Sequence, residues 1–405
     1  MKQIDTFLAF ARRQMSMPRS YQGSPALYVI QKGTYHLRQS LKRARRRLLR
    51  PGTEDETAGR LETYEQAIGS RDWDSVLREA SEIASFAERK RNAGLMLDMS
   101  KAFLRLGVYD RSGQLALGAR QIRQQGSGKE WTGQDISDRT LLIEFVEDVK
   151  QGIGGILRFA PFLSPALARA KRTIVVTERR LVPLLKRTFP EADVRERSEG
   201  VEKARGEADV FACFEHLAYI FAGSARTMET GFAPLKADPE LTRRFRESYA
   251  QAGTPLIGLS WGSKSYNKDV PDLRAWSRFI ADVPARFVSL QYGKVPADLP
   301  LLSGKHPERI IHDTSVDQIQ DMDRFAAQIC ALDAVVSISN TPAHFAGALG
   351  VPAIILIDDK FHTPWPVRGD RVPWYPRSRI ALKNGRDWSA VLQETGQKLR
   401  DLAGN

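Results

Sequence analysis

Cysteine is scarce in this chain, and long hydrophobic runs are missing. Of 405 residues only two are Cys, too few for a disulfide framework or for a zinc cluster built from cysteines. No apolar stretch approaches the roughly 20 residues that a membrane-spanning helix needs. The apolar run within residues 1–14 is too short and too interrupted for a secretory signal. These absences exclude small disulfide-rich secreted proteins and integral membrane proteins, and we expect a cytoplasmic protein.

Acidic residues are nearly absent from the first 52 positions. This segment holds twelve Lys or Arg and a single acid, Asp5, so it carries +11 of the formal net charge of +13. The rest of the chain carries only +2. A body without a broad basic surface argues against binding along a nucleic-acid duplex.

Within the basic segment, residues 36–50 predict an amphipathic helix with a basic face. Apolar residues recur there at steps of three and four, at Leu37, Leu41, Ala44 and Leu48. One interpretation is a solvated helix or basic arm. The other is a peripheral contact with anionic lipid headgroups at the inner face of the cell membrane, to which each basic residue adds about 1 kcal/mol. Because no aromatic residues are interleaved with the Arg cluster, we expect no specific nucleic-acid binding, and a polyanion contact is the weakest alternative.

We expect four parts along the chain, which are a basic segment, an all-helical module and two α/β units, at 1–52, 53–130, 131–250 and 251–405. In the helical module, Trp73 and Tyr109 lie 36 residues apart, and each follows a Gly-centred turn and precedes a helix. This spacing is close to the period of about 34 residues of tetratricopeptide helical hairpins. An ordinary pair of helical hairpins is the alternative.

From Leu141 onward, short apolar runs alternate with amphipathic helical stretches. Runs rich in β-branched and aromatic residues predict strands at 141–146, 173–177, 209–213, 255–261, 286–291, 334–339 and 352–357. Such alternation is typical of parallel sheets with helices on both faces, so we expect an α/β fold. A charged helix within 237–255 links the two α/β units.

Glycines follow the first predicted strand, at Gly152, Gly154 and Gly155. Glycine lets the backbone come close to a ligand, and a helix beginning near Ile156 offers N–H groups at its N-terminus. A tight turn without a ligand is the alternative.

A second strand-to-helix loop is the stronger candidate. Thr341 can cap its helix, and Pro342 suits the first helical position. Small residues such as Gly347 let this helix pack close to the sheet, so that its N-terminus points at the cleft with Asn340, Thr341 and His344 around it. This arrangement suits a diphosphate. In the alternative, Asn340 and Thr341 only cap the helix and His344 is a partly buried side chain.

A third loop leaves a predicted strand at Ser260. Lys264 and Lys268 in this loop can reach phosphates, although exposed loop lysines are usually only solvated. Residues 370–376 are rich in proline and aromatic side chains, which fits a rigid loop over the cleft or a packed surface loop.

These motifs resemble those of a known group. GLSWGSK, FVSLQYG, DMDRFAAQICALDAVVSISNTPAHFAGALGVP and GDRVPWYPRSRI occur in that order. Over roughly residues 131–405 the chain is similar to bacterial tetratricopeptide-repeat glycosyltransferase-like proteins, related to the heptosyltransferases of glycosyltransferase family 9 and to O-linked N-acetylglucosamine transferases. The resemblance implies a GT-B fold, with two Rossmann-like halves across a cleft, preceded here by the helical, TPR-like module. The donor nucleotide would lie mainly on the C-terminal half.

The resemblance also implies residue roles. Donor binding falls to Asn340, Thr341, His344, Lys264, Ser260 and Gly347, with His344 as the catalytic candidate. Gly152, Gly154 and Gly155 shape the acceptor side. We expect no metal and no cofactor apart from the nucleotide-sugar substrate, because helix dipoles and basic side chains stabilise the leaving diphosphate.

The chain departs from the group at two positions. Gly155 stands where an acid, the presumed general base of heptosyltransferases, is usual, and Ser339 stands where Asp is common. A general base is worth roughly 10²–10⁴-fold in rate, and Glu147, Asp148 or His344 are the candidate substitutes.

Two functions therefore stay open. The first is a glycosyltransferase that moves a sugar from a nucleotide-sugar to a glycan, lipid-linked or protein acceptor in surface-polysaccharide or protein glycosylation. The alternative is a catalytically degenerate GT-B scaffold or regulatory binding protein.

Overall fold

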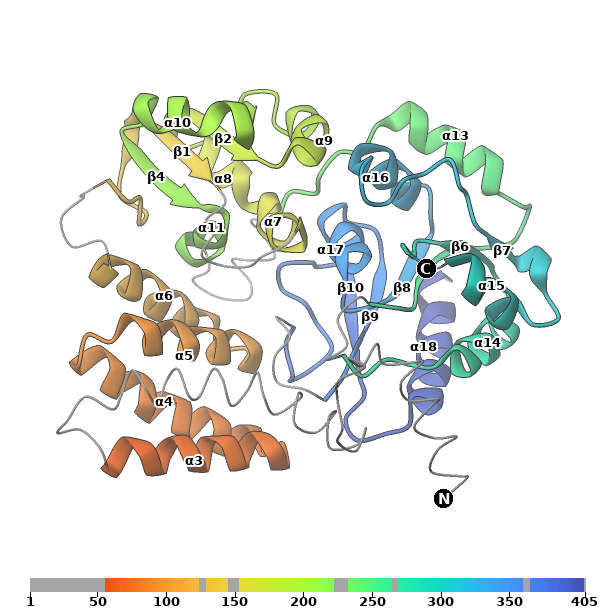
Figure 1. The fold of residues 1–405 in the computed structure, drawn as a ribbon, viewed down its shortest axis with the longest axis horizontal. Helices are drawn as coiled ribbons and strands as arrows, with labels where there is room; N and C mark the ends of the chain where they lie inside the picture. The colour runs from red at the N-terminus through yellow and green to blue at the C-terminus, as the bar shows by residue number, and fades with distance from the viewer. Residues whose placement is uncertain are drawn as a thin grey trace, which may run out of the picture.

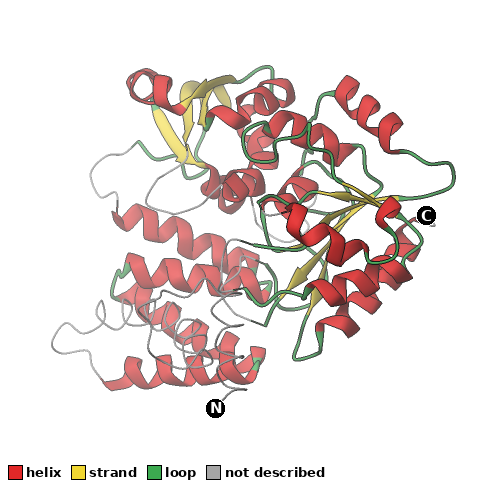
Figure 2. Cartoon of the chain, turned by 45° about the vertical axis from the view of Figure 1, so that its right-hand side comes forward, coloured by secondary structure: helices red, strands yellow, loops and turns green. Residues whose placement is uncertain are grey.

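The computed structural model describes residues 55–123, 129–144, 153–221, 232–263, 268–293, 295–359 and 365–403. They form a helical module and two α/β halves, each built on its own parallel sheet (Figures 1 and 2). The basic segment 1–52, with its predicted helix at 36–50, lies outside the described residues, so its lipid contact stays a prediction. None of the described helices is long and apolar enough to cross a membrane.

The helical module consists of α3 (Asp55–Ser70), α4 (Trp73–Arg89), α5 (Ala93–Leu106) and α6 (Tyr109–Arg123). Asp72 caps α4 by accepting a hydrogen bond from the Ser75 backbone, and Gly107 at φ +82° ends α5. Trp73 and Tyr109 each begin the second helix of a hairpin, as the spacing predicted. The tetratricopeptide assignment remains an interpretation.

The N half is built on a four-stranded parallel sheet in the order β3-β2-β1-β4. Its strands are β1 (Ile136–Glu144), β2 (Ala170–Thr177), β3 (Asp193–Glu196) and β4 (Val210–Cys213). Its helical segments are α7 (Ile153–Phe159), η1 (Ala160–Phe162), α8 (Leu163–Leu167), η2 (Arg179–Leu181), α9 (Val182–Thr188), α10 (Arg197–Glu207) and α11 (Phe214–Phe221), where η marks a 3₁₀ turn. The buried apolar run of β1 is confined to residues 141–143, where helices cover both faces of the sheet.

The C half is built on a six-stranded parallel sheet in the order β10-β9-β8-β5-β6-β7. Its strands are β5 (Leu256–Ser260), β6 (Arg286–Ser289), β7 (Ile310–Ile311), β8 (Ala334–Ile338), β9 (Ala353–Ile357) and β10 (Ser378–Leu382). Its helical segments are α13 (Pro239–Tyr249), α14 (Leu273–Asp282), α15 (Val295–Ser303), η3 (Pro307–Arg309), α16 (Met322–Cys330), α17 (Thr341–Ala348) and α18 (Trp388–Ala403). This is the doubly wound order, in which the ligand crevice lies where the strand order reverses, here between β5 and β8.

Each of the seven runs that predict strands overlaps one, although β1 and β2 begin before their runs, and the predicted charged linker is α13. Three strands were not predicted. Strand β3 is polar, with Asp193 and Arg195 bonded to each other across its edge. Strand β7 has only two residues, and β10 follows a proline-rich stretch that masks its short apolar run. Edge strands of this kind carry little apolar patterning, which is why periodicity misses them.

The helical module contacts the N half through a buried ionic cluster. The Arg120 guanidinium on α6 donates to Glu130 at 2.6 Å, and His216 Nδ1 on α11 lies 3.1 Å from the same carboxylate oxygen. Burial disfavours the charged forms of both His216 and Glu130. The neighbouring Cys213 thiol and Glu130 nevertheless raise the pKa of His216 to about 9, and His216 and Arg120 lower the pKa of Glu130.

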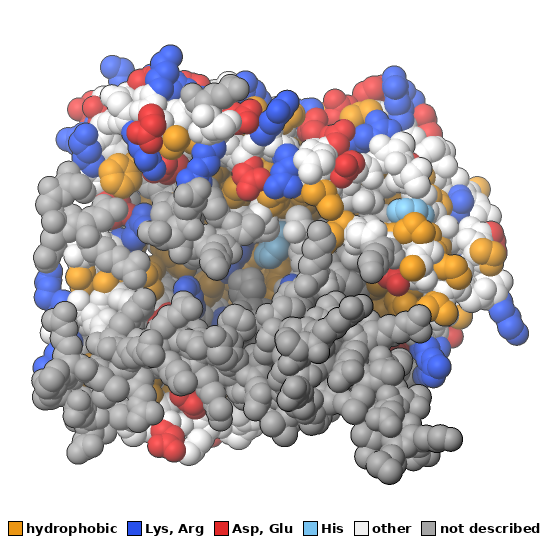
Figure 3. Space-filling view, viewed as in Figure 1, with side chains coloured by type: hydrophobic (Ala, Val, Ile, Leu, Met, Phe, Trp, Pro, Cys, Tyr) orange, Lys and Arg blue, Asp and Glu red, His pale blue; other side chains and the backbone are white. Residues whose placement is uncertain are grey.

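The module also contacts the C half. Arg71 pairs with Asp359 at 2.9 Å and Asp74 with Arg368 at 2.5 Å. The Val367 backbone N–H donates to the carbonyl of Arg105 at 2.9 Å. The module is therefore fixed to both halves. On the face shown in Figure 3, acidic and basic side chains are interspersed over the N half and α13, in keeping with the near-neutral body.

Candidate functional site

The candidate site lies where the C-half sheet reverses its strand order. Ser260 ends β5, and Asn340 follows β8. The Asn340 Nδ2 group donates to Ser260 Oγ at 2.7 Å and to the Gly262 carbonyl at 3.3 Å. Ser337 Oγ donates to Asn340 Oδ1 at 2.8 Å. Asn340 thus ties together the two strand ends between which a doubly wound sheet binds its ligand.

Asn340 also caps α17, since its side chain accepts from the Ala343 backbone N–H. The expectation that Thr341 caps this helix is wrong, because Thr341 is the first helical residue and Pro342 follows it. The Thr341 hydroxyl is consequently left at the mouth of the helix N-terminus, half-buried. An Asn in extended backbone is as good a cap as Thr, and sequence alone does not choose between adjacent candidates.

Gln291 was missed by the sequence analysis. Its Oε1 accepts from Ser260 Oγ at 3.0 Å and from the backbone N–H groups of Trp261 at 3.0 Å and Gly262 at 2.8 Å. This one amide oxygen shapes the loop that leaves β5. A Gln at the end of the apolar run 286–291 is the sequence signal that points to such a role.

His344 lies in a packed aromatic cluster and is only 9% exposed. Its ring stacks on Trp365 with the centroids 4.7 Å apart, and its Nδ1 lies 3.1 Å from Tyr375 Oη. Burial, together with the charges of Arg158 and Lys268, lowers the pKa of His344 to about 3. The ring is therefore neutral at physiological pH. Its predicted catalytic role stays a prediction, and its surroundings favour a role in joining α7, α17 and the segment around residues 365–375.

Two of the candidate glycines lie at close helix contacts. A Cβ added to Gly154 would lie 2.8 Å from His344 Cδ2, and one added to Gly347 would lie 2.4 Å from Tyr375 ring carbons. Helix α7 begins at Ile153, so the expectation of a helix start near Ile156 is wrong and Gly154 and Gly155 belong to the first turn. Gly154 lets α7 of the N half approach α17 of the C half, whereas Gly347 lets α17 approach Tyr375 within the C half.

Of the remaining candidate residues in the loops, the structure describes Lys268 and Ser339. Lys268 Nζ donates to the Ser339 carbonyl, and burial lowers the pKa of Lys268 against the opposing charge of Asp358. The Ser339 hydroxyl accepts from Trp365 Nε1 at 2.7 Å. Gly152 and Lys264 lie outside the described residues, as do Glu147 and Asp148.

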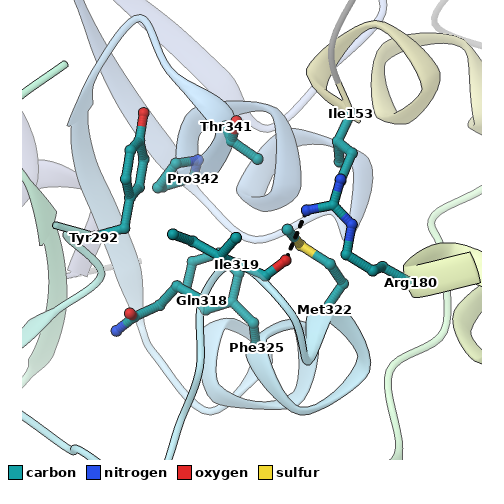
Figure 4. Close-up of a pocket in the computed structure, with 9 residues that line it drawn as sticks. All are labelled: Ile153, Arg180, Tyr292, Gln318, Ile319, Met322, Phe325, Thr341 and Pro342. Carbon is teal, nitrogen blue, oxygen red and sulfur yellow. Dashed lines mark hydrogen bonds between the residues drawn. The ribbon is translucent and has the colours of Figure 1, made fainter. Parts of the chain in front are cut away.

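A pocket of about 210 Å³ opens between the halves at the N-terminus of α17 (Figure 4). Its lining residues are Ile153, Arg180, Tyr292, Gln318, Ile319, Met322, Phe325, Thr341 and Pro342. Of the predicted donor residues, Thr341 lines it directly, while Ser260, Asn340 and His344 are buried and do not line it. Across the described ranges, no group of three His, Cys, Asp or Glu is placed to hold a metal ion.

Comparison with known proteins gives one curated relative and several structures. Protein FlbA of Caulobacter vibrioides is 28% identical over 302 residues, which are 69% of this chain and 50% of FlbA. The chain thus spans about half the length of that relative. No family model matches the sequence.

Among solved structures, a family 9 glycosyl transferase from Veillonella parvula matches 67% of this chain and 99% of its own, with 13% identity and a TM-score of 0.50. The E. coli ADP-heptose LPS heptosyltransferase II matches 65% of this chain and 98% of its own, with 14% identity and a TM-score of 0.45. The likeness to the family 9 glycosyl transferase confirms the expected GT-B fold. The chain has an α/β fold of the GT-B type, with a helical module in front of its two halves.

Proposed function

We propose that this protein is a glycosyltransferase that binds a nucleotide-sugar in the pocket between its halves. The observation that carries the proposal is the coincidence of three features. The pocket lies at the strand-order reversal, at the N-terminus of α17, and between two GT-B halves. Each feature alone is common in α/β proteins, but together they match the place where a doubly wound half binds a nucleotide.

The lining of the pocket supports an amphiphilic ligand. Tyr292, Ile319 and Phe325 offer aromatic and aliphatic surface for a nucleoside. The Thr341 hydroxyl and the N-terminal end of α17 suit a diphosphate. Asn340 and Ser260 act behind this surface by fixing the helix to both strand ends.

In the proposed reaction, an acceptor hydroxyl attacks the sugar carbon, the bond between that carbon and the diphosphate oxygen breaks, and the hydroxyl proton passes to the departing nucleoside diphosphate. The helix N-terminus stabilises the charge that develops on the leaving diphosphate, with Lys264 as the proposed supporting cation and without a metal. The acceptor would approach the start of α7 beside Gly155, because Gly154 itself packs against His344. A glycan, a lipid-linked sugar and a protein are the acceptor classes, and residues 36–50 would hold the protein at an anionic membrane surface.

A second candidate is a non-catalytic GT-B scaffold. Gly155 supplies no carboxylate, and His344 is a weak base because burial depresses its pKa. A protein with a donor pocket and no general base can still bind a nucleotide-sugar and signal that binding through its helical module.

Calorimetric titration with UDP-, GDP-, ADP- and CMP-sugars tests the donor site. We expect one donor class to bind in the micromolar to millimolar range typical of enzyme substrates, roughly 1 μM to 1 mM. Absence of binding to every donor overturns the proposal. If a donor binds, its turnover separates the candidates: turnover by the native protein eliminates the scaffold, whereas turnover gained only in Gly155→Asp favours it.

A further inference from the structure

One cation reaches the pocket from the half opposite to the proposed nucleotide-binding half. Arg180 belongs to η2, directly after β2 of the N half. Every other pocket residue except Ile153 belongs to the C half. In Figure 4, Arg180 and Tyr292 lie on opposite sides of the view, with Thr341 and Pro342 between them.

Arg180 brings a formal charge to the lining of this pocket, and Glu178, which does not line it, pairs with that charge. Arg180 is the charged side chain among the nine described residues that line the pocket, and the others are apolar, aromatic or neutral polar. One end of the pocket therefore suits a neutral ring system and the other suits an anion. Such a division of polarity fits a nucleoside joined to a phosphate group.

The guanidinium is held in place by two hydrogen bonds. Arg180 Nη1 donates to the Ile319 carbonyl at 2.8 Å, and Nη2 donates to Glu178 Oε2 at 2.5 Å. A guanidinium carries five N–H donors in a planar fork. Within the described part of the chain, Arg180 makes these two hydrogen bonds. Three of its N–H groups therefore remain for a ligand. Because Glu178 and Ile319 fix the plane, a phosphate would meet an oriented donor set with little further loss of side-chain freedom.

We propose that Arg180 binds the diphosphate of the donor from across the cleft, opposite the N-terminus of α17. This assignment deepens the proposed function and rests on it. The phosphates would lie between two positive features, the guanidinium from the N half and the helix N-terminus from the C half. Donor binding would therefore join the two halves through the ligand.

The test compares nucleoside diphosphates with their nucleosides by calorimetry. The variants are Arg180→Gln, Arg180→Lys and, as the matched control, Arg179→Gln, which changes an exposed arginine that does not line the pocket. Since a charge-assisted hydrogen bond contributes about 1.5–3 kcal/mol, Arg180→Gln should weaken diphosphate binding roughly 10- to 100-fold. Nucleoside affinity should stay unchanged, Arg180→Lys should keep part of the diphosphate affinity, and Arg179→Gln should bind as the native protein does.

Three outcomes separate the proposals. If the native protein binds no nucleoside diphosphate and no nucleotide-sugar, the proposed function fails and Arg180 loses its ligand with it. If the native protein binds and Arg180→Gln binds equally well, only the assignment of Arg180 is overturned. An equal loss of diphosphate and nucleoside affinity would mean that Arg180 acts by holding the pocket together, which also overturns its assignment as a phosphate ligand.

Discussion

Replacing Gly347 with alanine tests how closely α17 packs against the aromatic cluster. The added Cβ would lie 2.4 Å from Tyr375 Cγ and Cδ2 and 2.7 Å from Cε2. Carbon atoms in favourable contact lie roughly 3.5–4.0 Å apart, so the overlap exceeds about 1 Å. Tyr375 is fully buried, and its hydroxyl lies at hydrogen-bond distance from His344 Nδ1. The ring therefore has no vacant space into which it can turn.

The expected loss is about 2 kcal/mol of unfolding free energy. Overpacking a dense core costs about 1–3 kcal/mol, and an overlap with an immobile ring belongs at or above the upper end of that range. Alanine recovers up to about 1 kcal/mol by its better helix propensity. Gly206 in α10 is the matched control, because a Cβ added there meets nothing within 4 Å. Gly206→Ala should leave stability unchanged or raise it by up to about 1 kcal/mol.

Urea unfolding followed by tryptophan fluorescence measures the effect. Trp365 reports locally, since its ring centroid lies 6.1 Å from that of Tyr375. The decisive comparison repeats Gly347→Ala in a Tyr375→Ala background, where the overlap is gone and the substitution should cost nothing. A native-like midpoint for Gly347→Ala, or an equal loss in both backgrounds, would refute the packing argument.

Three further predictions concern the strand ends, the ionic cluster and the contact between halves. Asn340→Ala removes the cap of α17 and its bridge to β5, so we expect unfolding free energy to fall by about 1–3 kcal/mol in urea titrations, well beyond the effect of an exposed Asn→Ala change. The pKa of His216 is raised to about 9, so its contribution to stability should be complete below pH 6.5 and should disappear as the pH rises through 9. The decline in unfolding free energy between pH 7 and pH 10 should therefore be shallower in His216→Gln. Arg187 binds Asp323 across the halves through two hydrogen bonds at 2.6 and 2.7 Å, and a double-mutant cycle with alanine should give a coupling of about 1 kcal/mol or more; an additive cycle would contradict the pairing.

The sequence predicted the strand ends of the site well because those strands are central. Apolar runs at β5 and β8 are long enough to stand out, and their carboxyl ends carry Ser260 and Asn340. The alternation of strands and helices predicts a parallel sheet, but it does not say which strands pair. The reversal of strand order between β5 and β8 therefore becomes visible only in the structure. For this reason the sequence placed Ser260 and Asn340 at neighbouring strand ends without the hydrogen bond that joins them.

The role of the glycines was harder to predict. A small residue before or within a helix permits close approach, but the pattern does not say whether a ligand or another helix approaches. Gly154 and Gly347 were assigned to ligand contacts, whereas the structure places His344 and Tyr375 against them. The partners lie 190 and 28 positions away in the chain, beyond the reach of local periodicity.

The pocket that remains open explains why Arg180 matters more to the proposed function than the residues first singled out. Close packing of Gly154 on His344 fills the interface where α7 meets α17, so a ligand has no room there. Beside this contact, η2 approaches the loop at Ile319 through the Arg180 side chain, and a long side chain keeps backbones further apart than a glycine does. The halves thus meet closely at Gly154 and His344, and they are held further apart where Arg180 reaches Ile319. The pocket lined by Thr341 lies beside the second contact. The same interface that buries His344 leaves a pocket between the halves. Among the described residues that line this pocket, Arg180 carries the only charge.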